Sequence, residues 1–75
     1  MIALVPNLVR IDYCGRVAAI VVPGQAVIDD TLSEGALRHV QAKCLYALEL
    51  MESGCAERYT DVDAEDYARS ALGTN

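Results

Sequence analysis

The chain has 75 residues, of which 53% are hydrophobic and 23% charged, and its formal net charge is −5. A single domain of this size buries only about 60% of the surface of its unfolded chain, so we expect additional support from a partner chain, a metal or disulfides. The basic residues are scattered, which disfavours direct binding of nucleic acid. The longest apolar run, Val17 to Val22, is far shorter than the ~18 residues that span a bilayer, which excludes a membrane helix.

The cysteines indicate neither a disulfide framework nor a metal centre. Cys14, Cys44 and Cys55 are odd in number and show no CxxC spacing. Without a recognisable secretory leader, this pattern predicts free thiols in a cytoplasmic protein. The one histidine, His39, stands five residues before Cys44, which is not a zinc-ligand spacing. We therefore predict no metal and no cofactor, and a homodimer becomes the expected source of support.

An alternating pattern over residues 9–13 (VRIDY) predicts a half-buried β-strand with Val9, Ile11 and Tyr13 on one face. A second strand is expected over residues 17–22. Gly15-Arg16 between them is a Gly-X pair, which favours a type II′ hairpin turn.

The register of the two strands follows from this turn. It places Ile11 opposite Ile20 on the core face and leaves Ala19 and Val21 on the reverse face. A mixed outer surface is therefore expected on that reverse face.

Further strands are predicted on either side of the hairpin. Residues 2–5 form an apolar run that ends at Pro6-Asn7, and residues 26–28 follow a Pro23-Gly24 turn. The sheet, within residues 1–28, would then have three or four strands. Pairing of these edge strands within the chain and pairing across a dimer axis both stay open.

Residues 31–53 are predicted to form the central helix. Thr31 and Glu34 stand at capping-box spacing, and Gly54 stands where a left-handed C-terminal cap is expected. An apolar stripe is expected to pack on the sheet; it contains Leu37, Val40, Cys44, Ala47, Leu48 and Met51. Three further leucines lie outside this stripe, and we predict them as the dimer interface: Leu32, Leu45 and Leu50.

A short C-terminal helix is predicted over residues 61–72, with Glu65 and Arg69 as an i,i+4 ion pair. It is expected to cover the flank of the central helix that carries Leu45. His39 and Tyr46 are assigned to a solvated polar arc. The complete fold prediction is one α+β domain in which a small antiparallel sheet packs on one long helix, followed by a short helix.

The candidate contact surface lies near the start of this second helix, where acidic residues and tyrosines concentrate. Tyrosine is enriched at the energetic centres of interfaces, and carboxylates steer association towards a basic partner. The predicted partner-binding residues are Glu57, Tyr59, Asp61, Asp63, Asp66 and Tyr67. The alternative that these tyrosines cap a small core stays open.

No nucleotide-binding, metalloprotease or serine-hydrolase motif is present in the sequence, so we predict no catalytic residue and no enzyme. The leading hypothesis is a homodimeric interaction module that covers a partner's basic surface. One such partner would be a host nucleic-acid-handling protein, inhibited by an accessory protein of a phage or mobile element. The alternative hypothesis is a structural or regulatory subunit docked in a larger assembly.

Overall fold

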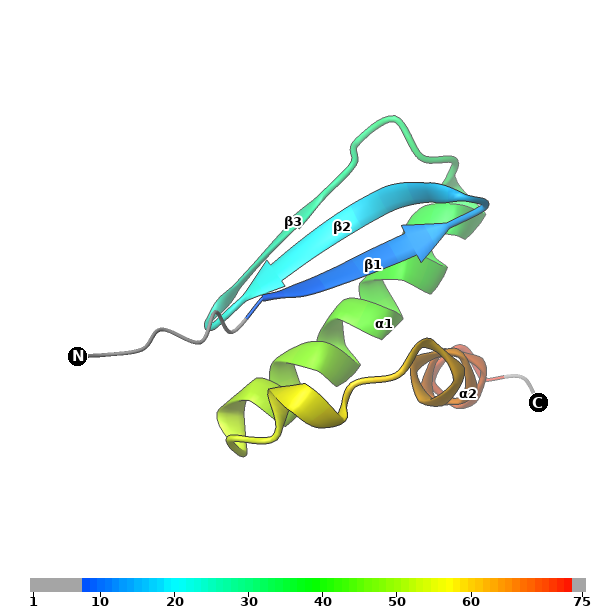
Figure 1. The fold of residues 1–75 in the computed structure, drawn as a ribbon. Coiled ribbons are helices and arrows are strands. Elements are labelled where there is room, and N and C mark those ends of the chain that lie inside the picture. Colours follow the sequence, from blue (N-terminus) through cyan, green and yellow to red (C-terminus); the bar gives the residue numbers. More distant parts are fainter. Residues whose placement is uncertain (1–7, 74–75) are drawn as a thin grey trace.

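The computed structural model describes residues 8–73 and confirms an α+β fold (Figure 1). Its elements are β1 (Val9–Tyr13), β2 (Arg16–Val22), β3 (Gln25–Ile28), α1 (Glu34–Glu52), the 3-10 helix η1 (Ala56–Arg58) and α2 (Asp61–Ala71). The strands form an antiparallel sheet in the order β1-β2-β3, and α1 packs on one of its faces and runs roughly along the strands. Helix α2 packs on α1 and crosses it steeply.

The predicted third strand pairs with β2 inside the chain, because β3 aligns antiparallel with β2 from Ala19 opposite Ile28 to Val22 opposite Gln25. The possible strand over residues 2–5 lies outside the described residues.

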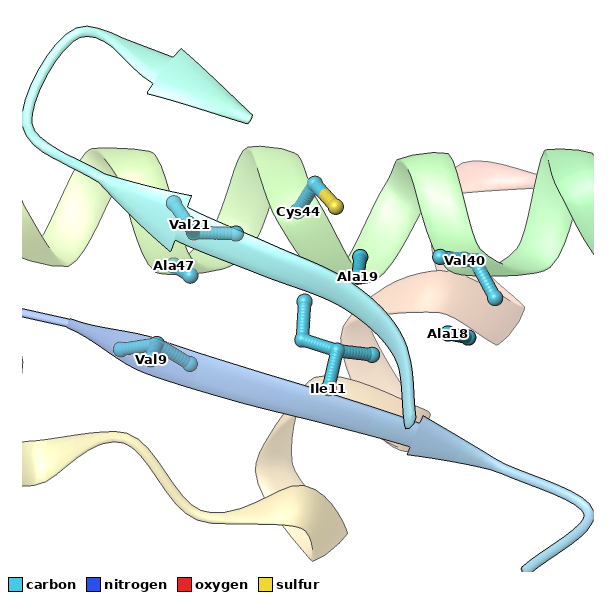
Figure 2. Packing of buried hydrophobic residues seen from close by; sticks show 8 residues of the cluster. All are labelled: Val9, Ile11, Ala18, Ala19, Val21, Val40, Cys44 and Ala47. Carbon is cyan, nitrogen blue, oxygen red and sulfur yellow. The ribbon is translucent and has the colours of Figure 1, made fainter. Parts of the chain in front are cut away.

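The hydrophobic core fills the space between the sheet and α1 (Figure 2). Its buried residues are Val9, Ile11, Ala18, Ala19, Val21, Val40, Cys44 and Ala47. The predicted stripe of α1 supplies the last three, with Leu48 and Met51 packed at the margin. Several of these side chains are small, so the sheet and the helix approach closely and the core has little bulk.

The hairpin turn differs from the prediction. Tyr13 pairs with Arg16, so the turn consists of Cys14 and Gly15 rather than Gly15 and Arg16. Both turn residues have positive φ, 54° for Cys14 and 80° for Gly15. A two-residue turn with this backbone belongs to type I′, not II′.

The register of the hairpin also differs from the prediction, because a β-bulge follows the turn. Pairing shifts between Asp12 opposite Val17 and Ile11 opposite Ala19, which leaves Ala18 as the extra residue. Ala19 is therefore buried with Val21, although both were expected on the reverse face. Ile20, expected in the core, is on the outer face of the sheet.

Helix α1 begins at a different cap from the predicted one. The Ser33 side chain, not that of Thr31, accepts a hydrogen bond from the helix, at 3.3 Å from Ala36 N. Thr31 instead donates to Asp29 Oδ1 from its backbone nitrogen at 2.9 Å and from its hydroxyl at 2.7 Å. The helix therefore begins further along the chain than predicted, because the Asp29 side chain holds Thr31 in a local turn that precedes the helix.

The predicted C-terminal end of α1 is confirmed. Gly54 has φ 73°, and its nitrogen donates to the Met51 carbonyl at 3.0 Å. The Cys55 nitrogen donates to the Leu50 carbonyl at 2.7 Å, which completes a Schellman motif.

Replacing Cys14 tests the turn assignment. Asn tolerates left-handed backbone better than Cys, so Cys14→Asn is expected to stabilise the fold by about 1 kcal/mol. Chemical denaturation of both proteins under reducing conditions measures this difference. Cys14→Ala retains a Cβ without the local hydrogen bonding of Asn and is the control; equal stability of the two variants would contradict the turn assignment.

Candidate functional site

A buried lysine joins α1 to α2. The Lys43 side chain is only 3% exposed, and its Nζ lies 2.9 Å from Asp61 Oδ1 and 2.9 Å from Glu65 Oε1. His39 adds a further contact, since its Nε2 lies 3.0 Å from Glu65 Oε2. Residues 39 and 43 are one turn apart on α1, as are residues 61 and 65 on α2. The two helices therefore present matching pairs of polar side chains to each other.

Small side chains bring the two helices close enough for these contacts. Ala42 of α1 and Ala64 and Ala68 of α2 are all buried. Helix α2 packs chiefly on α1, so its two buried alanines mark the crossing point. His39 is thus not solvated as predicted: its side chain is 18% exposed and its ring centroid lies 5.7 Å from that of Tyr13.

The charges of Lys43, Asp61 and Glu65 stabilise one another. Burial lowers the pKa of Lys43, but hydrogen bonds to the Glu65 and Asp61 carboxylates outweigh it and raise the pKa above its ordinary value. The pKa of Glu65 is lowered, first by its hydrogen bond with Lys43 and then by that with His39. At neutral pH the lysine is therefore cationic and the glutamate anionic, and their ion pair holds α2 on α1.

The contribution of Glu65 to stability depends on pH. Its folded pKa is below the ordinary 4.5, so its stabilising effect is present above pH 4.5 and is lost as pH falls through the folded value. Glu65→Gln is therefore expected to destabilise the protein by about 1 kcal/mol at pH 7, a modest figure because this carboxylate is partly exposed. The difference from wild type should shrink towards pH 3.

Urea unfolding at both pH values measures this effect. Glu57→Gln is the matched control, because Glu57 is exposed and has no ion pair among the described residues. A constant difference between Glu65→Gln and wild type across this pH range would show that the ion pair is not what stabilises the helix crossing.

Three tyrosine side chains lie together next to the ion pairs of Lys43. The ring centroid of Tyr46 lies 5.9 Å from that of Tyr59 and 5.3 Å from that of Tyr67. The Tyr67 hydroxyl donates to Glu49 Oε2 at 3.2 Å. Tyr46, predicted on a solvated arc, is thus half-buried against residues that follow α1.

Tyr59 packs against the margin of the core and does not stand free on the surface. It is half-buried against the core cluster, and its buried hydroxyl has no hydrogen-bond partner within residues 8–73. Burial, followed by the nearby Asp61 carboxylate, raises the pKa of this hydroxyl to about 12. The alternative interpretation, in which the tyrosines cap a small core, therefore applies to Tyr59.

Tyr59→Phe removes this buried hydroxyl and keeps the ring. An unpaired buried hydroxyl is unfavourable, so the variant is expected to be as stable as wild type or more stable by about 1 kcal/mol. Thermal unfolding at neutral pH provides the measurement. Tyr67→Phe is the control that loses an existing hydrogen bond; marked destabilisation by Tyr59→Phe alone would mean that the hydroxyl is satisfied in solution.

The predicted partner-binding carboxylates all remain exposed: Glu57, Asp61, Asp63 and Asp66. They differ in their contacts, because Asp61 is bound to Lys43 and Asp66 Oδ1 lies 3.9 Å from Arg69 Nη1. The expected Glu65–Arg69 pair is absent among the described residues, since Glu65 turns towards α1 instead.

The side of α2 that points away from α1 carries both charge and apolar surface. Val62 is 72% exposed, and helical spacing places Asp63 and Asp66 on the same side. We call Val62, Asp63 and Asp66 the α2 outer face. Its two carboxylates were among the predicted partner-binding residues, whereas Val62 was not, because the exposure of Val62 becomes evident only once the buried side of α2 is known.

The three leucines predicted as a dimer interface are not brought together. Leu32 precedes α1 and packs against the core cluster. Leu45 is 54% exposed and shares its arc of α1 with the exposed Gln41 and Glu49. Leu50 is half-buried on another side of the helix. Helix α2 covers the flank of Lys43 and His39, not the flank of Leu45 as predicted.

A hollow of about 240 Å³ lies between the hairpin turn and the start of α1. Two charged residues line it, Arg16 and Asp29, and they face each other at 3.8 Å between Nη2 and Oδ2. Asp29 also accepts the hydrogen bonds from Thr31. These polar groups are thus already paired with protein, and we assign no ligand to the hollow.

Cys44 has the properties of a core residue. It is buried between α1 and the sheet, and burial raises the pKa of its thiol to about 11. At neutral pH this thiol is protonated and therefore a poor nucleophile.

Residues 8–73 contain no group of three histidine, cysteine or acidic side chains arranged to hold a metal ion. None of their helices combines the length and the apolarity needed to cross a membrane. Comparison of the chain with protein-family models, curated proteins and solved structures finds no match.

Proposed function

We propose that this protein is a non-enzymatic interaction module that uses the α2 outer face, together with Glu57, to cover a basic surface of another protein. The observation that carries this proposal is an exposed valine between exposed carboxylates on a firmly anchored helix. Burying Val62 would supply apolar contact, and the surrounding carboxylates would supply attraction and orientation.

The acidic residues of this region divide into two groups. Asp61 and Glu65 face Lys43, so their charges hold the helix crossing together. Glu57 and Asp63 have no ion pair within the described residues, and Asp66 is only 3.9 Å from one exposed arginine. The negative charges of Glu57, Asp63 and Asp66 are therefore little neutralised within the protein, and they can attract and orient a cationic partner.

The expected partner is a protein with a groove of lysines and arginines, such as a nucleic-acid-handling protein, which this module would inhibit by occupying the groove. An accessory protein of a phage or mobile element would act in this way. We place the interaction in the cytoplasm, in keeping with three free cysteines. The alternative is a subunit docked permanently in a larger assembly, which the exposed Leu45 favours.

Charge reversal tests the α2 outer face. An arginine-rich peptide serves as the basic probe, and its binding is followed by fluorescence anisotropy at several salt concentrations. The triple variant Glu57→Lys, Asp63→Lys, Asp66→Lys should bind at least about tenfold more weakly than wild type at low salt. Asp61 and Glu65 are left unchanged so that α2 stays anchored.

The matched control reverses three exposed acidic residues elsewhere: Asp30→Lys, Glu34→Lys and Glu52→Lys. Each triple variant changes the net charge from −5 to about +1, because every reversal adds two charges. Equal loss of binding in both variants would assign the effect to net charge alone. No loss in the α2 variant would disprove the proposed surface.

A further inference from the structure

Within residues 8–73, strand β1 is an open edge of the sheet. The order β1-β2-β3 pairs β1 with β2 only, and none of the described strands lies along its other edge. Its two charged side chains, Arg10 and Asp12, are 62% and 51% exposed and lie 3.3 Å apart between Nε and Oδ1. An edge of this kind can pair with a strand of another chain.

The backbone of β1 is oriented for such pairing. Tyr13 and Arg16 flank a two-residue turn, and residues in that position exchange hydrogen bonds with each other. Backbone groups alternate in direction along a strand, so those of Asp12 and Arg10 point away from β2. The open edge therefore offers donors and acceptors at both charged positions.

The side chains of β1 are self-complementary. In an antiparallel pair of two β1 strands centred on Ile11, Arg10 of one copy faces Asp12 of the other, and the reverse pair forms by symmetry. Each arginine would then lie between its own aspartate and that of the second copy. Opposite charges directly across a strand pair are favourable.

This charge pattern also selects the register. Centring the pair on residue 10 would place arginine against arginine, and centring it on residue 12 would place aspartate against aspartate. A parallel pair in register would bring like charges side by side. The other edge of the sheet formed by the described strands is β3, which has the sequence QAVI and carries no charge that could select a partner.

We propose that the β1 edge binds the β1 edge of a second copy of this chain, which joins two sheets into one of six strands. A two-fold axis perpendicular to the sheet keeps both α1 helices on one face, and Val9 of each copy meets Tyr13 of the other at the core side. This interface is separate from the leucines expected from the sequence and from the α2 outer face.

Charge swaps at the β1 edge test this interface. Arg10→Asp makes all four facing charges negative, and Asp12→Arg makes all four positive. Each variant is expected to raise the dimer dissociation constant about a hundredfold, measured by sedimentation at sub-millimolar concentrations. Mixing the two variants restores opposite charges across both pairs, so a mixed dimer should form.

The mixed dimer keeps the test independent of folding, since it forms only from two folded partners. Arg38→Asp is the control, because it disrupts an exposed i,i+4 ion pair on α1 with Glu34 and should leave the dimer intact. A monomeric wild-type protein at every concentration would overturn the proposal. So would dimers unaffected by the two single variants, or no mixed dimer from variants whose circular dichroism is native.

Discussion

The burial of Lys43 is the constraint on which the arrangement of the two helices depends. A lysine ammonium removed from water is strongly unfavourable unless carboxylates surround it. Asp61 and Glu65 meet this requirement only if α2 lies across α1 with one particular side turned inwards. The same rotation points Val62 and Asp63 outwards. A structural ion pair on one side of α2 thus determines which surface the other side offers.

Most elements of the fold could be predicted from the sequence because burial leaves a periodic trace. The alternation in β1 and the apolar stripe of α1 both follow from which side faces the core. The register could not be predicted, because it depends on a left-handed residue, Cys14, and on a bulge at Ala18. Each shifts the pairing without changing the apolar pattern, and together they bring Ala19 rather than Ile20 into the core.

Packing of the second helix on the first was predicted, but on the wrong flank, for a related physical reason. Hydrophobic periodicity assigns His39 and Tyr46 to solvent, whereas α2 buries this flank, together with Lys43, through ion pairs, alanines and tyrosine rings. One signal was present in the sequence: a His-Lys pair at i,i+4 in one helix and an Asp-Glu pair at i,i+4 in the next. Complementary charged pairs on consecutive helices indicate a contact between them even where the flank is polar.

The small side chains of the core give a reason for the two proposed surfaces, the β1 edge and the α2 outer face, to act together. Its side chains are largely alanine and valine, so one copy gains limited stability from apolar burial, and pairing of β1 edges would add contacts without enlarging the core. Such a dimer would also present two copies of the α2 outer face. A partner with two basic sites at a matching spacing would then be bound at both, with an apparent affinity above that of either site alone. The α2 charges would provide attraction, and the geometry of the β1 pair would determine which spacing is recognised.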